Sequence, residues 1–158
     1  MYPPNMSDSS PQLDDQRTDA MQALVDAVMD RVGDSLRDIW VLDRHAQALL
    51  YMRDDVAART TTVDAQRYLD NERYGFITRA TYNRLHYATL RYTHRGFDTW
   101  ELFRTFLDAA DGTTSAGVVI GLDADGTCYD FDALTDTVHA VGDEHSVAAL
   151  TPATDEPP

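Results

Sequence analysis

Apolar residues recur at three- and four-residue steps near the start of the chain. These residues are Met21, Leu24, Val25, Val28, Val32 and Leu36. This stripe follows the capping-type residues Asp14, Asp15 and Thr18, and it predicts an amphipathic helix that Gly33 loosens or ends. A helix with a single apolar stripe has to pack that stripe against another layer of the protein.

Two short apolar runs follow the predicted helix, with a polar stretch between them. Residues 39–42 and 48–52 have the length and composition of strands, and the polar residues 43–47 are typical of a turn. The charged residues 53–55 end the second run. This pattern predicts an antiparallel hairpin.

A second hairpin and a fifth strand are predicted in the latter half of the chain. Residues 85–93 are rich in β-formers, a turn is expected near Gly96 and Asp98, and the strand pattern resumes from Trp100 to Phe106. A separate apolar run from Gly117 to Leu122 has the length of one strand.

Two further helices are predicted. Thr61 is a candidate N-cap with Asp64 three residues later, and the helix that it opens runs towards Asn71 before Gly75 breaks it. Residues 76–83 have no clear assignment. The last helix is predicted from a stripe at helical spacing, formed by Phe131, Leu134, Val138 and Val141.

The elements therefore follow the order α-β-β-α-β-β-β-α. We expect a single α+β domain, with helices packed on a five-stranded, mainly antiparallel sheet. The proline-bearing polar ends predict disordered tails at residues 1–13 and 144–158, and they leave residues 14–143 for the domain.

This order of elements resembles the profilin-like plan of the roadblock and longin families. The resemblance is one of topology and implies a non-catalytic, dimerising module of a regulatory complex. The chain also resembles small acidic haloarchaeal proteins of unknown function over residues 36–141, through pieces like residues 50–55, 90–98 and 117–123. That family implies no activity.

The composition is strongly skewed towards acids. The chain has no lysine, 23 aspartates, 4 glutamates and 13 arginines, and its formal net charge is -14. Molar salt shortens the Debye length to roughly 3 Å and removes most of the self-repulsion of such a surface. We therefore expect a halophilic, cytoplasmic protein. Cys128 has no second cysteine to pair with, and the chain lacks an apolar run long enough to span a membrane.

One segment reverses this charge. Residues 73–97 contain five arginines and no acid, so the segment carries +5 while the remainder carries -19. Its aromatic residues favour three readings: a protein or self-association surface, a nucleic-acid surface, or arginines paired with the chain's own carboxylates. Neutralising five phosphates gives a salt slope of about -4.5, so nucleic-acid binding is disfavoured in molar salt.

We therefore predict that the chain binds a protein partner, with a homodimer as one form. An exposed sheet edge and arginine–tyrosine contacts would supply the adhesion. The residues selected as partner-binding are Tyr87, Arg91, Tyr92, Arg95 and Trp100. Trp40 and Trp100 are expected in a core or an interface.

Catalytic and metal-binding patterns are weak in this sequence. The acidic stretch at residues 123–132 lacks the spacing of an EF-hand, and the five histidines form no HxH, HExxH or HxxxH pair. The absence of lysine excludes an ordinary P-loop. No catalytic residue, metal or cofactor is predicted. A small enzyme remains as an alternative, with a site assembled from Asp123, Asp125, Asp130, His86, His94 and His139.

Overall fold

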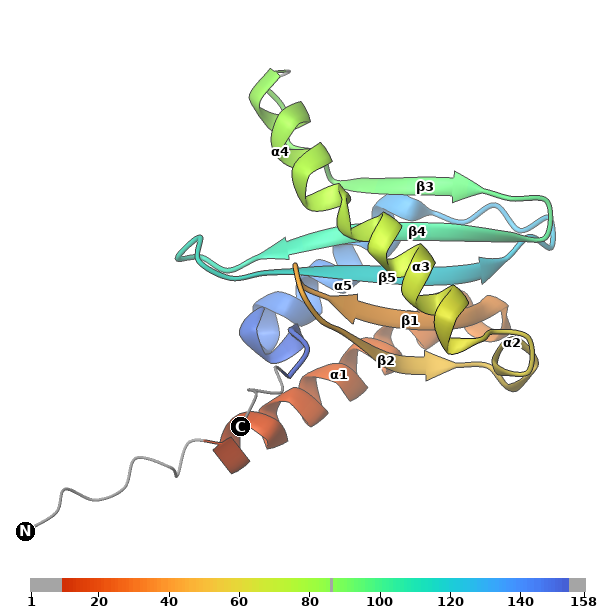
Figure 1. Cartoon of the computed structure of the whole chain (residues 1–158), viewed down its shortest axis with the longest axis horizontal. Coiled ribbons are helices and arrows are strands. Elements are labelled where there is room, and N and C mark those ends of the chain that lie inside the picture. The colour runs from red at the N-terminus through yellow and green to blue at the C-terminus, as the bar shows by residue number, and fades with distance from the viewer. Residues whose placement is uncertain (1–9, 86, 154–158) are drawn as a thin grey trace, which may run out of the picture.

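Five strands form one antiparallel sheet in the computed structural model, which describes residues 10–85 and 87–153. The strands are β1 (Leu36–Leu42), β2 (Gln47–Met52), β3 (Tyr92–Gly96), β4 (Trp100–Asp108) and β5 (Ser115–Asp123). Their order across the sheet is β2-β1-β5-β4-β3, and every neighbouring pair is antiparallel. The β2 and β3 strands are therefore the two edges (Figure 1).

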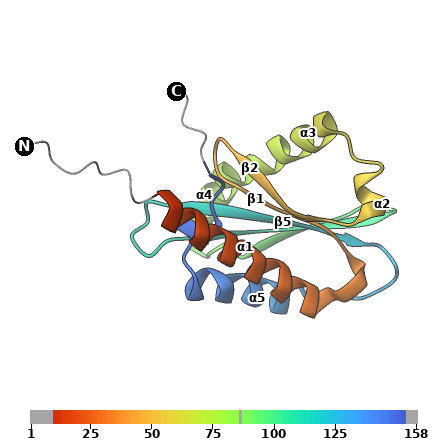
Figure 2. The same ribbon diagram turned by 90° about the horizontal axis from the view of Figure 1, so that it is seen from below.

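The helices cover both faces of this sheet. They are α1 (Ser10–Val32), α2 (Asp54–Ala57), α3 (Thr62–Arg73), α4 (Gly75–Leu85) and α5 (Phe131–Glu144), with 3₁₀ turns at Gly33–Ser35 and Ala148–Leu150. The α1 and α5 helices lie on one face, and α3 lies on the other (Figure 2). The predicted α+β class is confirmed, and the predicted elements occur in the predicted order. The predicted middle helix corresponds to α3, and α2 and α4 are additional helices on either side of it.

The main core lies between the sheet and the helices α1 and α5. Leu24 and Val28 stand one turn apart on α1 and are fully buried, as the helical stripe predicts. Ile39 and Val41 of β1 face this core, and Phe103 of β4 joins them. Because residues alternate along a strand, the intervening side chains of β1 point to the opposite face.

A smaller core lies under α3 and α4. Leu69 of α3 and Phe76 of α4 pack there against the sheet. The buried carboxylate of Asp38 lies beside this core, where it accepts hydrogen bonds from Tyr68 Oη at 3.0 Å and from Trp40 Nε1 at 3.1 Å. Burial raises the pKa of Asp38 even though both hydrogen bonds favour the ionised form. Asp38 thereby ties α3 to the centre of the sheet.

A network of ion pairs fastens one end of the sheet. The Arg53 guanidinium, which follows β2, donates to both carboxylate oxygens of Asp123 at the end of β5, at 2.7 and 2.9 Å. It also donates to the carbonyl oxygen of Asp34 at 2.8 Å. Arg37 contacts the same Asp123 carboxylate at 3.3 Å. These hydrogen bonds hold the pKa of Asp123 below its ordinary value.

The expected strand over residues 85–93 is wrong for most of its length. Residues 75–85 form helix α4, and regular pairing with β4 begins only at Tyr92, opposite Thr105. The residues Tyr87, Ala88 and Thr89 are exposed, so their β-propensity is not supported by packing against a neighbouring strand. Residues 76–83, for which the sequence gives no clear assignment, belong to the same helix. Gly75 and Phe76 are the residues of this helix that are buried.

Several predicted boundaries agree with the structure. Gly33 follows the end of α1 with a φ of 61°, Thr61 caps α3 by accepting a hydrogen bond from the Asp64 amide, and the second hairpin turns between Gly96 and Trp100. The domain limits need correction. The α1 helix begins at Ser10, and Ala149 and Leu150, which we expected in a tail, are buried. Within the described residues, no helix combines the length and apolarity needed to cross a membrane.

Candidate functional site

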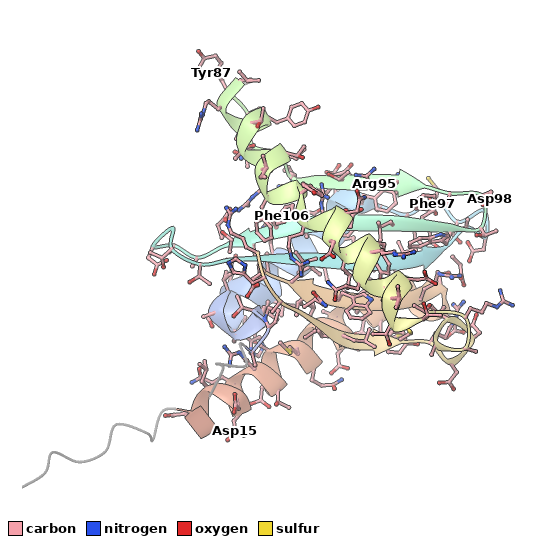
Figure 3. All side chains as sticks on the ribbon, in the orientation of Figure 1. Asp15, Tyr87, Arg95, Phe97, Asp98 and Phe106 are labelled. Atoms are coloured by element: carbon pink, nitrogen blue, oxygen red, sulfur yellow. The ribbon has the colours of Figure 1, made fainter. Side chains whose placement is uncertain are left out.

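The structure distributes the five residues selected as partner-binding over two sides of the molecule. Tyr87 follows α4, has a φ of 53° and is 98% exposed. Figure 3 shows it at the far end of α4, well away from the sheet. Arg91 precedes β3, Tyr92 and Arg95 lie on β3, and Trp100 begins β4. The five residues therefore do not form a single surface.

Tyr92 and Trp100 face opposite cores. Tyr92 stacks on Phe103 with ring centroids 5.8 Å apart, on the face that α5 covers. Trp100 lies on the α3 face, where it meets the ring edge of Tyr68 at 6.3 Å and stacks on Phe97 at 4.8 Å. Trp40 packs in the same cluster as Trp100, and both tryptophans are partly buried against the smaller core, which is one of the two locations expected for them.

Most arginines of the positive segment already contact carboxylates of the same chain. These contacts are Arg73–Asp70 at 2.5 Å, Arg79–Asp108 at 2.7 Å, Arg91–Asp136 at 2.8 Å and Arg95–Glu72 at 3.3 Å. The hydrogen bonds from Arg79 hold the pKa of Asp108 below its ordinary value. This pattern supports the internal-pairing reading for four arginines, and it leaves fewer guanidiniums free for phosphates than the nucleic-acid alternative needs.

A buried ion pair joins the end of α3 to the sheet. Arg104 donates from Nη1 to the Glu72 carboxylate at 2.6 Å and from Nη2 to Thr93 Oγ1 at 3.1 Å. Burial lowers the pKa of Arg104. Gly75 leaves the space that the guanidinium occupies, since a Cβ there would lie 2.5 Å from Arg104 Cζ. Our sequence reasoning did not select this pair. Its only signal is an arginine placed inside the apolar run of β4.

A groove of about 600 Å³ lies between α4 and the edge strand β3. Tyr74, which lies between α3 and α4, forms one wall together with Thr78 and Tyr82 of α4. Thr93 and Arg95 of β3 form the other wall. Arg104 lies at its base. Tyr74 is 67% exposed and Tyr82 is 50% exposed. We call these walls the α4–β3 surface.

The alternative of an assembled enzyme site gains no support from the described residues. Asp123 accepts hydrogen bonds from Arg53, and Asp130, the N-cap of α5, accepts a hydrogen bond from the Ala133 amide. His94 contacts the Glu101 carboxylate at 2.9 Å. His139 contacts Thr105 Oγ1 at 3.0 Å, and His86 lies outside the described residues. In the described part of the chain, no group of three or more histidine, cysteine or acidic side chains could hold a metal ion.

Two solved MglB structures are similar to this chain in fold. A solved structure described as MglB with a tetrameric arrangement superimposes with a TM-score of 0.53 and 16% identity, covering 84% of this chain and 92% of that one. Myxococcus xanthus MglB gives a TM-score of 0.52 and 10% identity, covering 80% and 91%. At these identities the likeness concerns the fold alone.

Residues 22–143 match the model of a family described as a domain of unknown function, DUF7522. The chain belongs to this family. A comparison with curated proteins gives no match.

Proposed function

We propose that this chain is a non-catalytic protein-association module that pairs with a second copy of itself through the α4–β3 surface. The observation that carries the proposal is the position of α4, which runs out beyond the edge strand β3 (Figure 1). The helix and the free edge of β3 therefore offer one continuous surface to a partner.

The edge strand supplies the first component of binding. The outer backbone groups of β3 have no strand beside them in the described sheet, and an edge of this kind pairs readily with a strand of another chain. An antiparallel β3–β3 contact about a twofold axis would extend the sheet across both copies. A twofold axis with the same surface used by both copies is the commonest symmetry of soluble homo-oligomers.

The wall formed by Tyr74 and α4 supplies the second component. Tyr74 and Tyr82 expose large amphipathic rings beside Arg95, and tyrosine and arginine are typical anchors of protein interfaces. Contact between flat aromatic and guanidinium groups depends less on long-range charge than an isolated ion pair does, so it tolerates high salt.

The comparisons support this proposal. A protein of similar fold is described in a tetrameric arrangement, and the roadblock and longin resemblance implies association within a regulatory complex. We further propose a cytoplasmic, salt-adapted protein of haloarchaeal origin, because the acid-rich, lysine-free composition suits molar salt.

Two substitutions on α4 test the proposal. Thr78→Glu places a charge on the wall that faces β3, whereas Ala80→Glu places the same charge on the other side of the helix. We expect sedimentation equilibrium in molar KCl to give twice the chain mass of 17.7 kDa for the wild type and for Ala80→Glu. Thr78→Glu should shift towards the monomer. A monomeric wild type would refute the proposal.

A further inference from the structure

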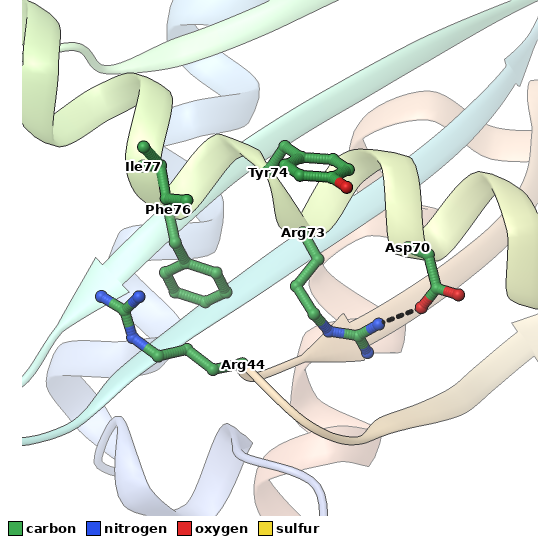
Figure 4. A pocket seen from close by; sticks show the side chains of 6 residues that line it. All are labelled: Arg44, Asp70, Arg73, Tyr74, Phe76 and Ile77. Carbon is green, nitrogen blue, oxygen red and sulfur yellow. Dashed lines mark hydrogen bonds and ion pairs between the residues drawn. The ribbon is translucent and has the colours of Figure 1, made fainter.

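A second exposed surface lies on the side of α4 that faces away from β3, next to the turn between β1 and β2. Two adjoining cavities of about 390 and 460 Å³ share Arg44, Phe76 and Ile77. Figure 4 shows Arg44 extending from the turn below Phe76, with Ile77 on the helix above. The Arg44 groove, as we name this region, has Arg44, Phe76, Ile77, Ala80, Arg84 and Leu85 in its lining. The cavity of about 390 Å³ is also lined by Tyr74 and by the paired side chains of Asp70 and Arg73.

The groove has an apolar centre that the described part of the chain does not cover. Ile77 is 63% exposed and Leu85 is 64% exposed, whereas Phe76, which lines the same cavity, is almost fully buried. Two large aliphatic side chains on one helix, standing beside a buried aromatic ring, are the pattern of a helix-in-groove contact.

The charge on the rim of the groove is uncompensated. Neighbouring guanidiniums are satisfied, since Arg73 contacts Asp70 and Arg79 holds both oxygens of Asp108. Arg44 and Arg84 have no carboxylate within salt-bridge distance among the described residues. The guanidinium carbon of Arg44 instead lies 5.1 Å from the centre of the Phe76 ring. Two open arginines thus flank an apolar strip in a chain whose net charge is -14.

We propose that the Arg44 groove binds an acidic amphipathic helix of another protein. Its aliphatic side chains would contact Ile77 and Leu85, and its carboxylates would pair with Arg44 and Arg84. A carboxylate matches the planar fork of a guanidinium, so both arginines gain charge-assisted hydrogen bonds on binding. A neutral or basic segment would cover them without giving them a partner, which costs free energy. The site differs from the α4–β3 surface because Ile77, Ala80, Arg84 and Leu85 line only the groove, whereas Tyr74 lines both.

The test uses the full chain in molar KCl and a synthetic fluorescent helix with leucines on one side and glutamates on both flanks. A second helix carries glutamine in place of every glutamate. We expect fluorescence anisotropy to show tighter binding of the glutamate helix by up to about tenfold, the change that 1.4 kcal/mol shared by two ion pairs gives. Ala80→Glu, and Arg44→Gln combined with Arg84→Gln, should remove that preference. Thr78→Glu should keep it.

Each other outcome overturns the proposal. Equal binding of the two helices would mean that the groove is merely apolar, and no binding of either would mean that it is not a docking site. Loss of the preference in Thr78→Glu but not in Ala80→Glu would place the contact on the β3 side. Circular dichroism and urea unfolding of each variant verify that the fold is retained. If Ala80→Glu rather than Thr78→Glu makes the peptide-free sample monomeric in sedimentation, a second copy of the chain fills the groove and the proposal fails.

Discussion

The Glu72 carboxylate and the Arg104 guanidinium lie 2.6 Å apart, and their side chains are only 2% and 4% exposed. Arg95 reaches the other oxygen of Glu72 at 3.3 Å from the exposed edge strand. One buried carboxylate therefore serves two arginines and links α3, β4 and β3. The wall that β3 contributes to the α4–β3 surface is held in place by this link.

The two members of the buried pair should differ in their sensitivity to substitution. Glu72→Gln leaves two guanidiniums without their anion, one of them buried, and should lower the free energy of unfolding by about 3–5 kcal/mol. Arg104→Met leaves Glu72 with Arg95 as a partner and should cost less, about 2 kcal/mol. Urea unfolding in molar KCl measures both. Arg91→Met breaks an exposed pair and serves as the control, with an expected change below about 1 kcal/mol. Equal losses for Glu72→Gln and Arg91→Met would contradict this ranking.

Gly75 is predicted to resist substitution by alanine even though it lies in a helix. Alanine normally favours a helix interior over glycine by about 1 kcal/mol. Here the added Cβ would lie 2.5 Å from Arg104 Cζ and 2.7 Å from Phe106 Cζ, so we expect a net destabilisation of about 1–3 kcal/mol. Gly142→Ala in α5 is the matched control, because its nearest neighbour is the flexible end of Leu107 at 3.2 Å. Thermal unfolding that ranks Gly75→Ala above the wild type would argue against this packing.

The Arg53–Asp123 pair predicts a pH-dependent contribution to stability. Hydrogen bonds from Arg53 lower the pKa of Asp123 in the folded state. A lowered pKa stabilises the fold above the pKa of the unfolded chain, and this contribution disappears as pH falls through the folded value. Arg53→Met should therefore lower stability by about 2 kcal/mol near neutral pH, and by progressively less in acid.

Melting temperatures measured from neutral pH down to about pH 3 follow this difference. Arg59→Met is the control for removing an arginine, since Arg59 has no ion pair among the described residues, and its curve should run parallel to that of the wild type. If the gap between Arg53→Met and the wild type stays constant as Asp123 is protonated, the pair does not act in this way.

Salt should stabilise the protein strongly. With 27 acids and 13 arginines, the folded chain repels itself in dilute buffer, and molar KCl screens that repulsion. We expect the melting temperature to rise steadily from low to molar KCl. A melting temperature that is unchanged or higher in dilute buffer would show that the acidic composition is not an adaptation to brine.

The sequence allowed the fold to be predicted where the local pattern and the packing agree. Leu24 and Val28 face the core at the spacing that the stripe implied, and Thr61 caps its helix as its position before Asp64 suggested. The sequence was less informative at residues 87–89, where β-forming side chains lie beyond helix α4 and are exposed. Only the pairing with β4, which is a long-range property, decides that the strand begins at Tyr92.

In the candidate site, too, the sequence reveals the composition of a segment but not the contacts that folding creates. The excess of arginines in residues 73–97 is visible in the sequence. Their carboxylate partners Asp108 and Asp136 lie far from them along the chain, so the sequence does not identify these pairs, whereas Asp70 lies only three residues before Arg73. Arg44 was not selected at all, because it lies in a turn remote from that segment. Folding places it beside Phe76, and no local pattern encodes that contact.

Amide hydrogen exchange at the two sheet edges tests the central claim most directly. The comparison is between β3 (Tyr92–Gly96) and β2 (Gln47–Met52) in the same sample, measured at low and high protein concentration in molar KCl. If two copies pair through β3, the exchange of its outward-facing amides slows as the concentration rises, while exchange along β2 stays the same. Unchanged exchange along β3, or slowing confined to β2, would contradict the proposed association.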